Sequence, residues 1–146
     1  MRTVLSIVGG LLFSFHCFAE QKIIVVANIA LNDNLNQISL SKSQIREIFM
    51  TGSSASIAAD MTLKPIALAP GNKSRVVFNT HVIGLPESRI QSYWAQMQFS
   101  GRYQPPMEVD DVSTMIERLK NTKGTIGYLP TTIPIPSGLV RVHPPF

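Results

Sequence analysis

The chain has 146 residues, and its 13 Lys and Arg residues against 9 Asp and Glu give a formal net charge of +4. No two basic residues are adjacent, so this mild excess is too scattered to indicate a nucleic-acid-binding protein, although it suits a small acidic ligand. The length predicts one domain.

The first 19 residues have the layout of a secretory signal peptide. Arg2 precedes an apolar stretch over 4–15, and small or compact residues, Cys17 and Ala19, stand just before Glu20. A membrane anchor is the alternative, but the apolar stretch is shorter than the roughly 20 residues that a spanning helix needs. We therefore predict cleavage after Ala19, which removes the only cysteine and leaves a periplasmic domain, 20–146, without stable membrane insertion.

Beyond the signal peptide, strand-like and helix-like segments alternate. Apolar and β-branched runs predict strands at 22–28, 62–69, 124–129 and 138–142. Caps and helical spacing predict helices at 39–50, 76–83, 86–99 and 110–120. Polar or aperiodic stretches at 32–37 and 52–60 predict loops. This alternation favours an α/β fold, a small sheet flanked by helices.

Spaced residues support two of the predicted helices. In the helix that ends at Gly84, the residues that fit helical spacing are Val76, Val77, Thr80 and Ile83. In the helix at 86–99, they include Tyr93, Trp94, Met97 and Phe99, which we expect in the core, with one edge as an alternative partner surface.

The turn within ALAPGNKSRVVF, residues 67–78, is the candidate ligand site. A helix N-terminus binds an anion through free backbone N–H groups and the helix dipole, and Gly71 lets a ligand approach. Asn72 and Ser74 add side-chain donors, while Lys73 and Arg75 raise the local potential. The same residues also suit an ordinary capped helix with two cations on its solvated face. Both interpretations stay open at this point.

Other candidate sites have weaker patterns. His81 and His143 lie far apart, and no cysteine remains after cleavage, so we expect no metal or other cofactor. Asp110 and Asp111 could form a carboxylate pair, but a helix cap is the usual role of such residues. No serine has the G-x-S-x-G context of an activated nucleophile, and we therefore expect no enzyme.

Three segments, in order and spacing, resemble the phosphate-type periplasmic substrate-binding proteins of ABC transporters. They are LSKSQIREIFMTG at 40–52, PGNKS at 70–74 and GTIGYL at 124–129, which are similar to that family's "LS..QL..IF.G" segment, phosphate turn and "GAIGYV" strand. The resemblance implies one lobe of the type 2 periplasmic-binding-protein fold. It covers about residues 23–130, and a segment equivalent to the first lobe does not precede it.

The resemblance also implies a function. It places phosphate or a similar small anion at Gly71, Asn72, Lys73, Ser74 and Arg75, with an ABC permease, a sensor or another envelope protein as partner. Two departures bear on the ligand: the family's phosphate-clamping arginine falls near Leu68, and its Gly-Thr pair is Lys73-Ser74. The alternative is an accessory module of the periplasm that kept the fold without the ligand.

Overall fold

A computed structural model of the chain describes residues 21–29, 38–52 and 62–146. The predicted signal peptide, the predicted loop at 32–37 and nearly all of the predicted loop at 52–60 lie outside these residues. In the part that the structure describes, no helix has the length and apolar character needed to cross a membrane.

The predicted alternation of strands and helices is confirmed, with one addition. The strands are β1 (Ile23–Asn28), β2 (Lys64–Leu68), β3 (Met107–Val109), β4 (Thr125–Pro130) and β5 (Val140–His143). The helices are α1 (Lys42–Thr51), α2 (Lys73–Phe78), η1 (Asn79–Ile83), a π-helical segment that continues α2, α3 (Glu87–Phe99) and α4 (Val112–Asn121). Only β3 was not predicted from the sequence, because Pro105 and Pro106 precede this short strand and suggest a break in the chain.

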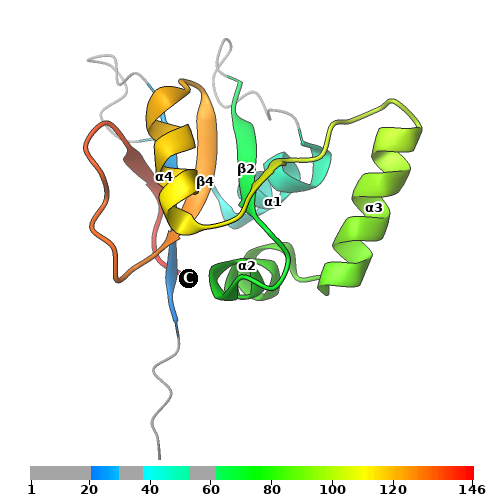
Figure 1. The fold of residues 1–146 in the computed structure, drawn as a ribbon, viewed down its shortest axis with the longest axis horizontal. Coiled ribbons are helices and arrows are strands. Elements are labelled where there is room, and N and C mark those ends of the chain that lie inside the picture. The colour runs from blue at the N-terminus through cyan, green and yellow to red at the C-terminus, as the bar shows by residue number, and fades with distance from the viewer. Residues whose placement is uncertain (1–20, 30–37, 53–61) are drawn as a thin grey trace, which may run out of the picture.

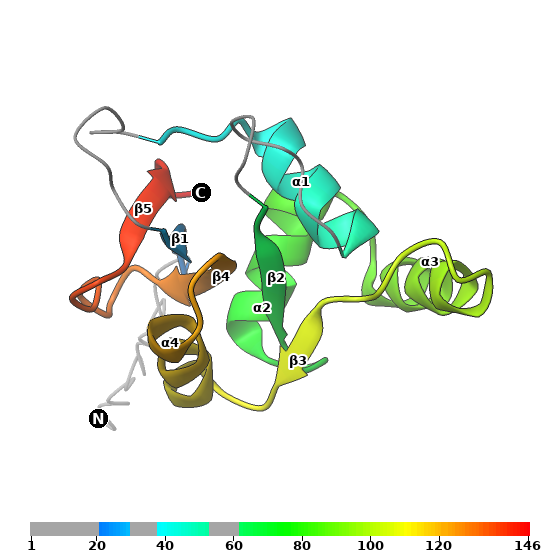
Figure 2. The ribbon, with the colours of Figure 1, turned by 90° about the horizontal axis from the view of Figure 1, so that it is seen from above.

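The strands form one mixed sheet in the order β3-β2-β4-β1-β5. β2 is parallel to β3 and β4, whereas β1 is antiparallel to β4 and β5. α4 covers one face, and α1 and α2 cover the other (Figures 1 and 2). α3 stands beside the sheet. The predicted fold class, a small mixed sheet flanked by helices, is therefore confirmed.

Helix α1 begins at a capping box. The Ser41 hydroxyl accepts a hydrogen bond from the Gln44 backbone N–H, and the Gln44 side chain accepts one from the Ser41 backbone N–H. The apolar side of α1, Ile45, Ile48 and Phe49, is buried. The helix therefore starts a few residues after the predicted position 39, and it packs through the apolar spacing that the sequence predicts.

The GTIGYL strand joins the two layers of the core. Its Tyr128 ring stacks on Phe78 with centroids 4.1 Å apart, on the α2 face of the sheet. Its Gly127 lies under α4, where an added Cβ would come within 2.7 Å of Met115 Sδ. A residue without a side chain is needed at this position because α4 packs closely on β4.

The buried sides of two helices differ from what their apolar residues alone indicate, and the predicted core position of Phe99 is wrong. On α2 and η1 the buried side chains are Ser74, Arg75, Phe78, Asn79, Val82 and Ile83. Val76 is 55% exposed, because the polar residues Ser74 and Arg75 take the inward side of the first turn. On α3, Trp94 is buried, but Phe99 at the last turn is 96% exposed because the end of α3 extends beyond the body of the domain (Figure 1).

Candidate functional site

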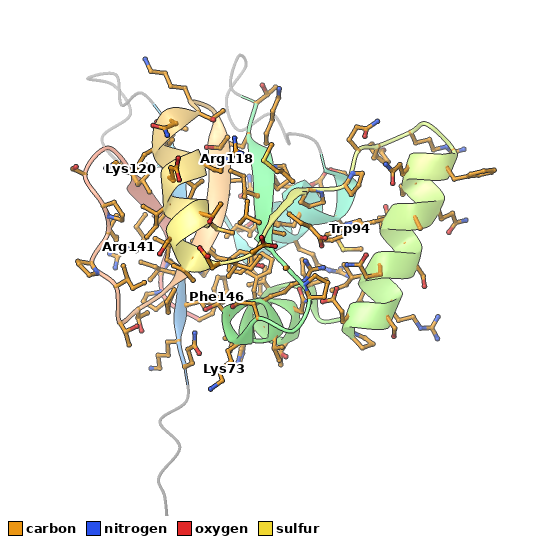
Figure 3. The ribbon with its side chains drawn as sticks, in the orientation of Figure 1. Lys73, Trp94, Arg118, Lys120, Arg141 and Phe146 are labelled. Atoms are coloured by element: carbon orange, nitrogen blue, oxygen red, sulfur yellow. The ribbon has the colours of Figure 1, made fainter. Side chains whose placement is uncertain are left out.

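The predicted anion site, called the cradle below, consists of Gly71, Asn72, Lys73, Ser74 and Arg75, and it spans the end of the turn after β2 and the first turn of α2. Gly71 has φ +87°, a left-handed conformation that suits glycine, and an added Cβ there would meet nothing within 4 Å. Asn72 caps α2, since its side-chain oxygen accepts a hydrogen bond of 2.9 Å from the Ser74 backbone N–H. Lys73 is exposed and points away from the domain (Figure 3).

Ser74 does not face solvent. Its side chain is 2% exposed, and its hydroxyl accepts a hydrogen bond of 2.7 Å from the Gln21 side-chain amide. The hydroxyl thus joins α2 to the residues just before β1. The side-chain oxygens of Asn72 and Ser74 both have partners inside the protein.

Arg75 is the most deeply enclosed polar group of the cradle. It is 1% exposed, and protein groups surround its guanidinium. Nε and Nη2 donate to the two carboxylate oxygens of Glu87, at 2.9 Å and 2.5 Å. Nη1 donates to the Leu68 carbonyl and to Glu108. The Trp94 ring lies against the guanidinium, with 5.3 Å from Cζ to the ring centroid.

Arg75, Glu87, Glu108 and Trp94, together with the Leu68 carbonyl, are called the Arg75 cluster below. Its members come from α2, α3, β3 and the end of β2. Glu87 also accepts hydrogen bonds from the side-chain amides of Asn79 and Gln91, one at each of its two carboxylate oxygens. One cation against two carboxylates leaves one net negative charge, so the cluster repels an added anion.

The protonation of the cluster follows from this pairing. Burial by itself lowers the pKa of Arg75, but hydrogen bonds and charges from Glu87 and Glu108 outweigh it and raise the pKa overall. For Glu87, burial raises the pKa, and hydrogen bonds from Arg75 and Gln91 reverse this and hold it below its usual 4.5. The ionised form of each group is therefore the stable one at neutral pH.

The lowered pKa of Glu87 predicts an acid-dependent loss of stability. The folded-state pKa lies below the unfolded value, so the stabilising contribution is present above that unfolded value and disappears as pH falls through the folded one. We expect the free energy of unfolding of the wild type to fall more steeply than that of Glu87→Gln between about pH 5 and pH 3. Urea denaturation of both proteins across this range measures the difference. Parallel curves would contradict the assignment.

Tyr128 holds the same strand end from the other side. Its hydroxyl accepts a hydrogen bond of 3.0 Å from the Leu68 backbone N–H, so side chains bind both polar groups of Leu68. Burial raises the pKa of Tyr128, and the phenol therefore stays neutral. The end of β2, where the sequence places the ligand, is thus fixed by two buried side chains.

The five cradle residues lie together in the fold but do not direct their side chains to one place. Lys73 faces solvent, Asn72 and Ser74 bind within the protein, and Arg75 enters the core. The sequence did not reveal Glu87 and Glu108, which lie 12 and 33 residues from Arg75. Glu87 had one available signal, its position after Pro86 at a helix start, but this predicts only a dipole interaction.

Other candidate residues take structural roles. Asp111 is the N-cap of α4, and its carboxylate accepts a hydrogen bond of 2.8 Å from the Thr114 backbone N–H, as the cap interpretation predicts. Hydrogen bonds from Thr114 hold the pKa of Asp111 below its ordinary value. Among the residues that the structure describes, no three His, Cys, Asp or Glu side chains are grouped to hold a metal ion.

Comparison with known proteins supports the fold. No family model and no curated protein sequence matches the chain significantly. Solved protein structures, in contrast, do match the chain. An ABC-type phosphate transport receptor from Vibrio cholerae matches with a TM-score of 0.58 and 12% identity, over 84% of this chain and 45% of that one.

Two further structures agree. A putative phosphate ABC transporter substrate-binding protein from Clostridium perfringens, with bound phosphate, matches with a TM-score of 0.59 and 13% identity, over 84% of this chain and 44% of that one. PstS from Borrelia burgdorferi matches with a TM-score of 0.53 and 11% identity, over 76% of this chain and 41% of that one. The chain spans less than half the length of each of these proteins, and it has the fold of one lobe of a phosphate-type substrate-binding protein.

Proposed function

We propose that the chain is a non-enzymatic accessory domain of the periplasm, which has the fold of a phosphate-binding lobe but does not bind an anion at Arg75. The Arg75 cluster is the observation that carries this proposal. The guanidinium is the strongest anion ligand in the predicted cradle, and Glu87, Glu108 and the Leu68 carbonyl bind it from within.

Electrostatics and access both favour this interpretation. A phosphate would have to displace two carboxylates, each with 35–40% of its side chain exposed, from a guanidinium that is 1% exposed. The bidentate contact with Glu87 already uses the planar fork by which arginine binds carboxylate or phosphate. The carboxylates therefore take the place of a ligand.

An accessory domain acts through a surface, and the end of α3 supplies one. Phe99 is 96% exposed, and Tyr103 lies four residues further along the chain at 38% exposure. Aromatic side chains at protein surfaces are frequent anchors of protein–protein interfaces. We infer that this end of α3 contacts an envelope protein such as a permease or a sensor.

A second candidate function is weak anion binding at the exposed part of the turn. Lys73 is exposed beside Gly71, where the space around the backbone is open. The likeness to a solved structure with bound phosphate adds to this candidate. A single exposed helix terminus holds a charge by only about 0.3–1 kcal/mol, so such binding would be weak.

Calorimetric titration with phosphate tests both candidates. We expect no saturable heat from the wild type below about 1 mM phosphate, since the Arg75 guanidinium is already paired with two carboxylates. Saturable binding that Lys73→Gln abolishes would favour the second candidate. Binding that Arg75→Met alone abolishes would overturn the proposal.

Capture of a partner tests the accessory role directly. Wild-type protein and a Phe99→Ser variant, each with the same affinity tag, are exposed to the periplasmic extract of the source cells. We expect one stoichiometric partner with the wild type and its loss with Phe99→Ser, while the midpoints of thermal unfolding agree because Phe99 is outside the core. Arg89→Gln, an exposed change at the other end of α3, is the matched control. Equal recovery by both baits would exclude Phe99 as an anchor.

A further inference from the structure

A cavity lies at the end of β2 opposite to the predicted cradle. Its volume is ≈ 610 Å³, which falls within the size range of small-molecule sites in proteins. It opens between α4, β2 and the connection from α3 to β3. Apolar side chains make up much of the lining, namely Pro65, Ile66, Tyr103, Pro105 and Met107.

The cavity is separate from the Arg75 cluster. β2 runs from Lys64 to Leu68, and the cavity touches its first three residues, whereas the cradle follows its last. No residue of the cradle or of the Arg75 cluster lines the cavity. A ligand here would therefore leave the guanidinium and its carboxylates undisturbed.

The charged residues that the structure describes at the rim of the cavity have one sign. Among the described residues, Lys64, Arg102 and Arg118 line the cavity, and no carboxylate does. All three side chains are exposed, and both ion pairs found among the described residues belong to Arg75 instead. Figure 3 shows Arg118 on the side of α4 that faces β2, with Lys120 on the other side of the helix.

An apolar pocket with cations at its rim suits a ligand that has the same two parts. An aliphatic chain gains free energy from burial against Tyr103 and Met107, which are 38% and 55% exposed and which it would shield from water. A single anionic headgroup then lies near Lys64, Arg102 and Arg118, where hydrogen bonds from charged donors are available. Neither part alone accounts for both halves of the lining.

We propose that this cavity binds a small anionic amphiphile, a molecule with one acidic headgroup on an aliphatic chain. The chain enters the apolar part of the cavity, and the headgroup stays at the rim. This proposal is independent of the function of the Arg75 cluster, and it shares Tyr103 with the proposed contact surface at the end of α3.

Decanoate is the probe, and 1-decanol and decyltrimethylammonium are the matched controls, because they keep the chain and remove or reverse the charge. Binding to the wild type is measured by calorimetry below the micelle concentration of the two ionic compounds and below the solubility limit of 1-decanol. We expect saturable binding of decanoate, at least about tenfold tighter than that of either control. No saturable binding of decanoate, or equal binding of all three, would overturn the proposal.

Variants locate the site. Lys64→Gln with Arg118→Gln is expected to weaken decanoate binding by about five- to tenfold, because two exposed charge contacts are lost. Lys120→Gln, on the same helix but outside the lining, should leave it within about twofold. The positions are exposed, so all variants should keep the thermal unfolding midpoint of the wild type. An equal effect of Lys120→Gln, or no effect of the double variant, would contradict the assignment.

Discussion

Arg75→Met is expected to lower the free energy of unfolding by about 2–4 kcal/mol. The substitution leaves Glu87 and Glu108 without their shared cation, and it removes the donor to the buried Leu68 carbonyl. The upper values for broken buried ion pairs do not apply in full, since the two glutamates are partly exposed and water screens them. Urea denaturation at pH 7 measures the change.

A rescue experiment separates lost pairing from lost packing. Arg75→Met combined with Glu87→Gln and Glu108→Gln removes all three charges, and we expect it to recover more than half of the lost stability, because replacing a whole buried ion cluster is far milder than removing one partner. Arg89→Gln, an exposed arginine on α3, should change stability by less than about 0.5 kcal/mol. A loss as small in Arg75→Met as in Arg89→Gln would contradict the structural role of the cluster.

Gly52→Ala is the second change with a large expected effect, a loss of about 2–4 kcal/mol of unfolding free energy. Gly52 ends α1 with φ +67°, and its backbone N–H donates to the Ile48 carbonyl. An added Cβ would lie 1.2 Å from the Gln104 carbonyl oxygen, so the connection from α3 to β3 would have to move. Displacement of Gln104 from Gly52 also reshapes the cavity that these two residues line.

Gly84→Ala is the control for this prediction. Gly84 also ends a helical segment in the left-handed conformation, with φ +70°, but an added Cβ there would meet nothing within 4 Å. We expect a loss of only about 1 kcal/mol from the backbone conformation itself. Thermal unfolding followed by circular dichroism compares the two variants. Equal losses would show that Gln104 does not constrain Gly52.

Local signals were enough to predict most of the fold. A serine cap before α1, the β-branched run of β1 and the stop at Gly84 are local signals. Each reports a short-range requirement that tertiary contacts do not reverse. β3 was missed because its three residues follow two prolines and carry no alternating pattern. Phe99 was assigned to the core because its apolar character alone does not show where the end of α3 lies relative to the sheet.

The candidate site was less predictable, for a physical reason. The turn residues Gly71 and Asn72 are local, and the sequence identifies their cap and turn roles. The role of Arg75 depends on Glu87 and Glu108, which only the packing of α3 and β3 brings to it. A buried arginine and an exposed one have the same local sequence pattern, so sequence periodicity cannot distinguish an anion ligand from an internally paired cation.

The side-chain resonance of Arg75 tests the central claim most directly. In 15N-labelled protein, the Nε–H group that donates to Glu87 should give a resolved signal protected from exchange with water. We expect this signal to stay in place as phosphate is added to several millimolar, and to move in Glu87→Gln, which changes its acceptor. A saturable shift of the Arg75 Nε–H signal with phosphate in the wild type would show that the guanidinium binds the anion, and it would contradict the account.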